Sequence, residues 1–279
     1  MSSIIVFGGS RGIGKIIAEY LIGKGHEVTV GGRNTETLDR FQRSIAGQKL
    51  NGNVVKVDIT NQRDVMRAFK SHEAKWHENP DVVINCAALQ GPIGNSWEVP
   101  VNKWDETIKV NLIGAYIVAR TAIRNMIKKK HGSIILFSGG GAVFSRPNFS
   151  AYGVSKTGVL RLVETVAEEL KLAGYPDIVI NAVAPGAVKT EMTTRVLKAG
   201  SKAGMKALEE ASQVFKNGGT APEQIIDLID FLIDLKASHG LTGRLIHVRE
   251  DYKGLVKQFG ANVPDDIGKL RRIPIKVER

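Results

Sequence analysis

A tyrosine and a lysine one helical turn apart are the residues of this sequence best suited to proton transfer. Tyr152 and Lys156 lie four positions apart in a pattern that predicts a helix over residues 152–172, so they share one helix face. A free phenol has a pKa of about 10, and a neighbouring ammonium favours its ionised form. We expect Lys156 to bring the pKa of Tyr152 toward neutrality, so that the phenol can protonate a carbonyl oxygen or deprotonate an alcohol.

A glycine-rich turn near the N-terminus is suited to holding a pyrophosphate. A short apolar run, residues 4–7, leads into the glycine turn 8–14, and a helical pattern follows. Glycines let the backbone turn tightly, and the free N–H groups of a helix start attract negative charge. In this strand–turn–helix context the pattern predicts a dinucleotide site. The residues expected at the phosphates are Gly8, Ser10, Arg11, Gly12, Ile13 and Gly14.

The end of the second predicted strand indicates which dinucleotide is bound. An acidic residue there would bind the ribose 2′-hydroxyl of NAD, but residues 30–34 contain no Asp or Glu. Arg33 and Asn34 stand there instead, and Arg11 lies in the glycine turn. A guanidinium can hold a 2′-phosphate through two parallel hydrogen bonds. We therefore predict NADP(H) as the cofactor.

Short apolar runs rich in Val and Ile alternate with amphipathic helical stretches along most of the chain. This alternation predicts an α/β fold of one domain, a doubly wound sheet of about seven parallel strands with helices on both faces. The expected strands are residues 4–7, 27–30, 53–57, 82–85, 133–137, 178–182 and 244–248. The expected helices are residues 12–24, 35–45, 61–76, 104–127, 152–172 and 223–235.

Composition narrows the functional classes. The chain of 279 residues has 39 Lys and Arg against 28 Asp and Glu, a net charge of +11, but these charges are scattered, so we expect no specific nucleic-acid partner. The single cysteine, Cys86, cannot form an internal disulfide, and we find neither a signal-peptide pattern nor a membrane-spanning run. No pair of histidines has metal-binding spacing, so no metal is expected. These features predict a cytoplasmic protein.

Taken together, the motifs resemble those of the short-chain dehydrogenase/reductase family over residues 3 to about 248. Residues 8–14 resemble the family's TGxxxGxG loop, and 152–156 match its YxxxK motif. Tyr20 and Lys24 have the same spacing but lie on the first predicted helix, where we interpret them as structural. The resemblance implies a Rossmann fold, a role for Lys156 in holding the nicotinamide ribose, and Asn111 as the anchor of a catalytic water. It implies further cofactor contacts for Asp58, Ile59, Asn85, Ala87, Pro185, Gly186, Val188 and Thr190.

The family's catalytic serine is the weakest part of the resemblance. That serine stands thirteen positions before the tyrosine, where this chain has Gly139. The loop could hold one extra residue and leave Ser138 in the usual place, an interpretation favoured by the pliant glycines after it. Alternatively, Ser138 matches a non-catalytic neighbour and the hydroxyl is missing. On the first interpretation, Ser138 would hydrogen-bond the substrate oxygen.

Two segments lie outside the alternation. Residues 187–220 are expected to form a substrate lid within an NADP-binding domain of residues 1–249, and residues 250–279 a tail near the substrate cleft or at a subunit contact. The resemblance implies a homo-oligomer, a dimer or tetramer built on helices 104–127 and 152–172. The leading hypothesis is a ketone or 3-oxoacyl-thioester reductase acting on a small carbonyl or alcohol. The alternatives are a sugar-nucleotide-modifying member and a catalytically silent NADP-binding regulator.

Overall fold

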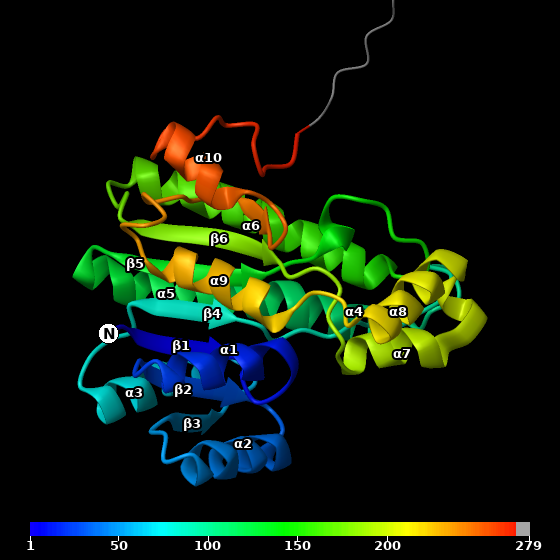
Figure 1. Cartoon of the computed structure of the whole chain (residues 1–279), viewed down its shortest axis with the longest axis horizontal. Helices are drawn as coiled ribbons and strands as arrows, with labels where there is room; N and C mark the ends of the chain where they lie inside the picture. Colours follow the sequence, from blue (N-terminus) through cyan, green and yellow to red (C-terminus); the bar gives the residue numbers. More distant parts are fainter. Residues whose placement is uncertain (272–279) are drawn as a thin grey trace, which may run out of the picture.

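The strands of the computed structural model, which describes residues 1–271, form a single parallel sheet. The order across the sheet is β3-β2-β1-β4-β5-β6-β7, and each neighbouring pair is parallel. The predicted seven-stranded, doubly wound Rossmann fold is therefore confirmed (Figure 1). The strands are β1 (Ser3–Phe7), β2 (Glu27–Gly32), β3 (Asn53–Lys56), β4 (Val82–Asn85), β5 (Gly132–Phe137), β6 (Ile178–Ala184) and β7 (Leu245–His247).

The direction in which the chain is wound reverses between β1 and β4. The chain goes from β1 outward through β2 to β3, then returns to place β4 on the other side of β1. In an open parallel sheet such a reversal leaves a crevice at the carboxyl ends of the two central strands, where ligands bind. The crevice lies beyond Phe7 and Asn85, which are paired in the register of β1 and β4.

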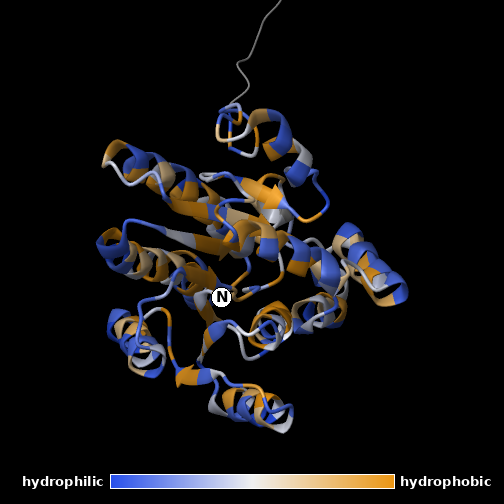
Figure 2. Cartoon of the chain, turned by 60° about the vertical axis from the view of Figure 1, so that its left-hand side comes forward, coloured by the Kyte–Doolittle hydropathy of each residue, from blue (hydrophilic) through white to orange (hydrophobic). Residues whose placement is uncertain are grey.

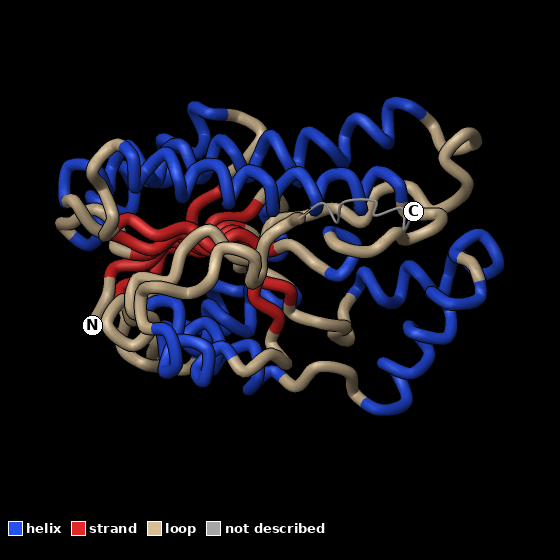
Figure 3. The backbone as a smooth tube through the Cα atoms, turned by 90° about the horizontal axis from the view of Figure 1, so that it is seen from above, coloured by secondary structure: helices blue, strands red, loops and turns tan. Residues whose placement is uncertain are grey.

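Helices cover both faces of the sheet, as seen from above in Figure 3. Their apolar sides face the strands, and their charged sides face outward (Figure 2). One buried cluster joins the sheet to α1, α2, α9 and α10, and a second joins its other face to α3, α5 and α6. The α-helices are α1 (Gly12–Gly23), α2 (Thr35–Gly47), α3 (Gln62–Trp76), α4 (Val101–Ile108), α5 (Gly114–Lys129), α6 (Ser150–Leu172), α7 (Glu191–Ala199), α8 (Met205–Asn217), α9 (Pro222–Ile233) and α10 (Tyr252–Phe259).

The long helix expected over residues 104–127 is interrupted in the structure. Between α4 and α5 the chain makes a π-helical turn, Lys109–Ile113, which contains Asn111. The Asn111 amide accepts a hydrogen bond from Leu89 N at 2.7 Å and donates one to Leu89 O at 2.8 Å. Single π-turns inside helices often occur at functional sites, and this one lets a buried side chain fasten the loop after β4.

The predicted lid segment consists mainly of α7 and α8, which stand beyond the carboxyl end of the sheet (Figure 1). These two helices pack on each other through alanines and Val196, and Phe149 at the start of α6 completes their small apolar cluster. Ile93 and Tyr152 pack against the same cluster. The lid therefore has its own core and contacts the wall that carries Tyr152.

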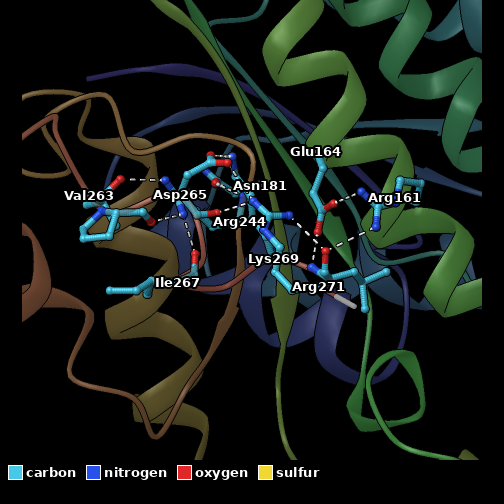
Figure 4. Close-up of polar contacts among 11 residues, drawn as sticks. Arg161, Glu164, Asn181, Arg244, Val263, Asp265, Ile267, Lys269 and Arg271 are labelled. Atoms are coloured by element: carbon cyan, nitrogen blue, oxygen red, sulfur yellow. Dashed lines mark hydrogen bonds and ion pairs between the residues drawn. The ribbon is translucent and has the colours of Figure 1, made fainter. Parts of the chain in front are cut away.

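The C-terminal tail packs across α6, α9 and the β7 edge. Arg244, at the start of β7, is buried, and its guanidinium donates hydrogen bonds to the carbonyls of Val263, Pro264 and Ile267 at 2.5–2.9 Å (Figure 4). Leu270 N donates to Glu164 Oε1 on α6 at 2.5 Å. The tail was expected near the substrate cleft or at a subunit contact. Its described part covers the sheet edge and does not line the cavity, so the first alternative is not observed, while the subunit contact stays a prediction; residues 272–279 lie outside the described residues.

We predict that Arg244→Met loosens the tail without changing the active site. The substitution removes hydrogen bonds to three carbonyls, one buried and two half-buried, so we expect a loss of about 3 kcal/mol in the free energy of unfolding. Residues 260–271 should exchange their amide hydrogens faster. The kcat should stay within about twofold, because none of the tail residues described lines the cavity at the carboxyl ends of the strands. Unchanged exchange protection of the tail would contradict the anchoring role of Arg244.

Candidate active site

A large cavity opens at the carboxyl ends of the strands, at the crevice left by the reversal of winding. Its volume is about 560 Å³, within the range of small-molecule sites. Most of the residues predicted from the sequence line it: Gly8, Ser10, Arg11, Gly12, Ile13, Gly14, Arg33, Asn34, Asp58, Ile59, Ala87, Ser138, Tyr152, Lys156, Pro185 and Thr190. The predicted residues Asn85, Asn111, Gly186 and Val188 are not among those lining the cavity.

The glycine turn has the geometry of a phosphate cradle. Gly8 has a φ of 73°, in the region that favours glycine, and its N–H donates to Gly31 O at 2.7 Å. A side chain at Gly14 would place its Cβ only 2.3 Å from Gly8 O, so the turn closes tightly on α1. No side chain caps the N-terminus of α1, and its first N–H groups face the cavity edge, where a pyrophosphate fits.

The end of the cavity lined by Arg33 and Arg11, where we predict the adenosine of a cofactor, is basic, and one of its two arginines is paired with a carboxylate. Arg33 and Arg11 both line it, as predicted, but the Arg11 guanidinium lies 2.5 Å from the carboxylate of Glu191 at the start of α7. Both side chains of this ion pair are 57% exposed, so the pair contributes little to stability and opens readily. Glu191 was not foreseen from the sequence. It lies 180 residues from Arg11, and no local pattern connects the two.

Tyr152 and Lys156 lie on one face of α6, as expected, but their electrostatics differ from the expectation. Lys156 Nζ donates to Phe137 O at 2.6 Å and lies 5.6 Å from the centre of the Tyr152 ring. Burial lowers the pKa of Lys156 to about 8. Burial also raises the pKa of Tyr152, against a smaller lowering by Arg146, so the predicted shift toward neutrality is wrong for this structure. Burial thus disfavours the ionised form of the phenol.

Ser138 and Gly139 face different partners. Ser138 is buried, and its hydroxyl donates to the backbone carbonyl of Lys156 at 3.1 Å. A Cβ at Gly139 would lie 3.2 Å from Tyr152 Oη, so position 139 is the one directed at the phenol. The catalytic role of Ser138 stays a prediction, but this geometry supports the alternative in which the hydroxyl beside the tyrosine is missing. Ser138 instead ties the end of β5 to α6.

Asn111 acts on the cavity through its neighbours. Besides Leu89, its amide donates to Ser155 Oγ at 3.0 Å, one helical position before Lys156. Asp58 accepts hydrogen bonds from Thr60 N and Thr60 Oγ1, which fixes its carboxylate at the cavity wall. Sequence reasoning missed several residues that line the cavity, because they come from loops or from the lid: Leu89, Gln90, Glu191, Met192 and Arg195.

Comparison with known families assigns the chain to a class. The family model described as short chain dehydrogenase matches residues 2–201. A relative from Mycobacterium bovis, the 3-oxoacyl-[acyl-carrier-protein] reductase MabA, is 32% identical over 247 residues, which cover 88% of this chain and 90% of the relative. The chain therefore belongs to the short-chain dehydrogenase family, whose members are oxidoreductases that bind a nicotinamide cofactor.

Solved structures with the same fold include users of both nicotinamide cofactors. A variant of actinorhodin polyketide ketoreductase solved with NADPH superposes with a TM-score of 0.77 at 24% identity, covering 88% of this chain and 94% of that one. A xylitol dehydrogenase bound to NAD⁺ superposes with a TM-score of 0.76 at 25% identity, covering 88% and 96%. Choice of cofactor in this chain must therefore be argued from its own residues.

We predict that Gly139→Ala impairs turnover more than Ser138→Ala. The alanine methyl would crowd Tyr152 Oη and the substrate oxygen beside it, and we expect at least a roughly tenfold loss in kcat, about 1.4 kcal/mol in the barrier. Loss of the Ser138 hydroxyl should cost about 1 kcal/mol of stability and less than about threefold in kcat. A Ser138→Ala loss of about a hundredfold or more, typical of a missing oxyanion donor, would show that Ser138 is catalytic.

Proposed function

We propose that this protein is an NADP(H)-dependent reductase of small ketones or 3-oxoacyl thioesters, with Tyr152 as the acid that protonates the carbonyl oxygen. The observation that carries the proposal is the Tyr152 phenol, with Lys156 one helical turn away, lining the same cavity as a glycine turn shaped for a pyrophosphate. Burial raises the pKa of Tyr152, and its neutral phenol can protonate a carbonyl oxygen. We propose the reduction of a carbonyl as the reaction on this ground.

In the proposed mechanism the start of α1, Lys156, Tyr152 and Asn111 each have a defined role. The bound cofactor supplies the hydride. The N–H groups of the α1 start hold its pyrophosphate, and Lys156, already fixed on Phe137 O, holds the ribose hydroxyls. Tyr152 hydrogen-bonds the substrate oxygen and gives its proton to it as negative charge develops there. Asn111 fixes the Leu89 loop and Ser155. A water relay from Asn111 to Lys156 then returns to Tyr152 the proton that it gave to the substrate.

NADP(H) is proposed over NAD(H) because no Asp or Glu stands at the end of β2, where an acid would bind a ribose 2′-hydroxyl. Arg33 and Arg11 line the cavity; of the two carboxylates that also line it, Glu191 is paired with Arg11 and Asp58 is hydrogen-bonded to Thr60. A 2′-phosphate would compete with Glu191 for Arg11, so the glycine turn and α7 would both lie beside the same bound cofactor. The relative solved with NADPH shows that the fold accommodates this cofactor.

The setting of the enzyme is proposed from its surface and its cysteine. None of the helices within residues 1–271 is long and apolar enough to cross a bilayer. The single Cys86 suits a reducing compartment, and we propose the cytoplasm. Ile113, Tyr116 and Val154 are exposed on the π-turn, α5 and α6, and we propose that these helices form the interface of a homodimer or tetramer.

Tyr152→Phe tests the proposed reaction. Wild-type protein should oxidise NADPH steadily with at least one ketone of a panel, and the variant should lose about a hundredfold to ten-thousandfold in kcat while binding NADPH normally. The matched control is Tyr20→Phe on α1, whose hydroxyl donates to Asp230 far from the cavity and whose loss should leave kcat unchanged. A wild-type protein that binds NADPH but reduces no ketone would point to the regulatory alternative.

Arg33→Glu tests the choice of cofactor. A carboxylate at this position repels a 2′-phosphate and can bind a 2′-hydroxyl, so we expect NADPH affinity to fall at least about tenfold and NADH affinity to rise or stay constant. Fluorescence titration of both cofactors measures the change, with Arg43→Glu at the exposed end of α2 as the charge-matched control. Equal losses for the two cofactors would refute the assignment of NADP(H).

A further inference from the structure

A buried glutamine in the cavity wall has an unsatisfied amide. Gln90 lies in the loop between β4 and α4, is 8% exposed, and lines the same cavity as Tyr152 and Lys156. Its Oε1 is buried and has no hydrogen-bond partner among residues 1–271. A buried polar atom in this state costs about 1–3 kcal/mol and is uncommon in native proteins. The amide therefore calls for a partner from outside the chain.

The backbone on both sides of Gln90 is held firmly. The π-turn residue Asn111 bonds both the N–H and the carbonyl of Leu89. On the other side, Gly91 has a φ of 75°, and a Cβ there would lie 2.5 Å from Thr107 Oγ1, so this turn is closely packed on α4. Gln90 thus stands between two fixed points. The backbone that carries Gln90 is therefore preorganised, while the side-chain amide can still rotate about its last torsion.

The path of the loop places Gln90 toward the substrate. Ala87, three residues earlier, lies against the glycine cradle: a Cβ at Gly8 would meet Ala87 N at 2.6 Å. Ile93, three residues later, packs against the cluster formed by α7, α8 and Phe149, as Tyr152 does. Gln90 comes between these ends, in a wall where Leu89 and Met192 are apolar. It offers an amide in a largely apolar part of the cavity, which suits one specific polar group on the substrate.

We propose that Gln90 determines substrate specificity by accepting a hydrogen bond from a hydroxyl that the substrate carries in addition to its reacting carbonyl. This inference rests on the proposed function and names the class of its substrates as hydroxyketones. Rotation about the last side-chain torsion exchanges the amide oxygen and nitrogen, so the acceptor can turn toward the ligand. A ketone with a methyl in place of the hydroxyl leaves the Gln90 amide unpaired, so we expect the enzyme to favour the hydroxyketone over this analogue.

The test compares ketones that differ only in that group. NADPH oxidation is measured with acetoin against methyl isopropyl ketone, and with hydroxyethyl methyl ketone against methyl propyl ketone; in each pair a methyl replaces the hydroxyl. Wild-type protein should prefer one hydroxyketone at least about tenfold in kcat/KM. Gln90→Met, of similar size and apolar, should lose that preference, whereas Gln62→Met, on the exposed start of α3, should keep it. A preference unchanged in Gln90→Met would overturn the proposal.

Two further measurements separate this proposal from others. NADPH affinity should stay within about twofold in Gln90→Met, and a loss of tenfold or more there, with the preference retained, would assign Gln90 to the cofactor instead. The side-chain amide signal of Gln90 in ¹⁵N NMR, identified by its loss in Gln90→Met, should shift when a hydroxyketone is added to the NADPH complex, and not with its methyl analogue. If no ketone is turned over, the proposed function fails. The presence or absence of a shift in the Gln90 amide signal on adding a hydroxyketone still decides whether Gln90 binds the hydroxyl.

Discussion

Two reciprocal hydrogen bonds between the end of β5 and α6 hold the reactive part of this protein in place. Lys156 Nζ donates to Phe137 O at 2.6 Å, and Ser138 Oγ donates to Lys156 O at 3.1 Å. Each residue thus uses its side chain to satisfy a backbone carbonyl of the other segment. Because Phe137, Ser138 and Lys156 are all buried, breaking either bond would cost more than it would at the surface. The helix that carries Tyr152 is therefore fixed to the sheet at the point where the cavity begins.

The same burial sets the chemistry. Removing an ammonium and a phenol from water disfavours the charged form of each, so the pKa of Lys156 falls to about 8 while the pKa of Tyr152 rises. Reasoning from the helical spacing alone considered the attraction between the two groups and left out the loss of solvent. In the fold, the ammonium is turned toward a carbonyl at the sheet end, and burial raises the pKa of the phenol more than Arg146 lowers it. The result favours a protonated tyrosine.

Around this centre, segments that are far apart in the chain meet at the cavity, where the contacts between them are weak. The glycine turn and the predicted lid segment are joined by the exposed ion pair of Arg11 with Glu191, which a ligand can replace. By contrast, the tail is fastened by a buried arginine and by Glu164 of α6, neither of which lines the cavity. Firm anchoring thus occurs at the sheet edge, and an exposed, weak contact occurs where a cofactor would enter.

The sequence by itself determined the layers of the fold and the identity of most cavity residues. Strand–helix alternation, the glycine turn and the pair Tyr152 and Lys156 are local patterns, and local backbone preferences fix what they become. It left undecided which of Ser138 and Gly139 faces the phenol, where the tail packs, and that Gln90 lines the cavity with an unpaired amide. Those features depend on contacts between residues distant in the chain, and on the removal of water, so only the tertiary structure could decide them.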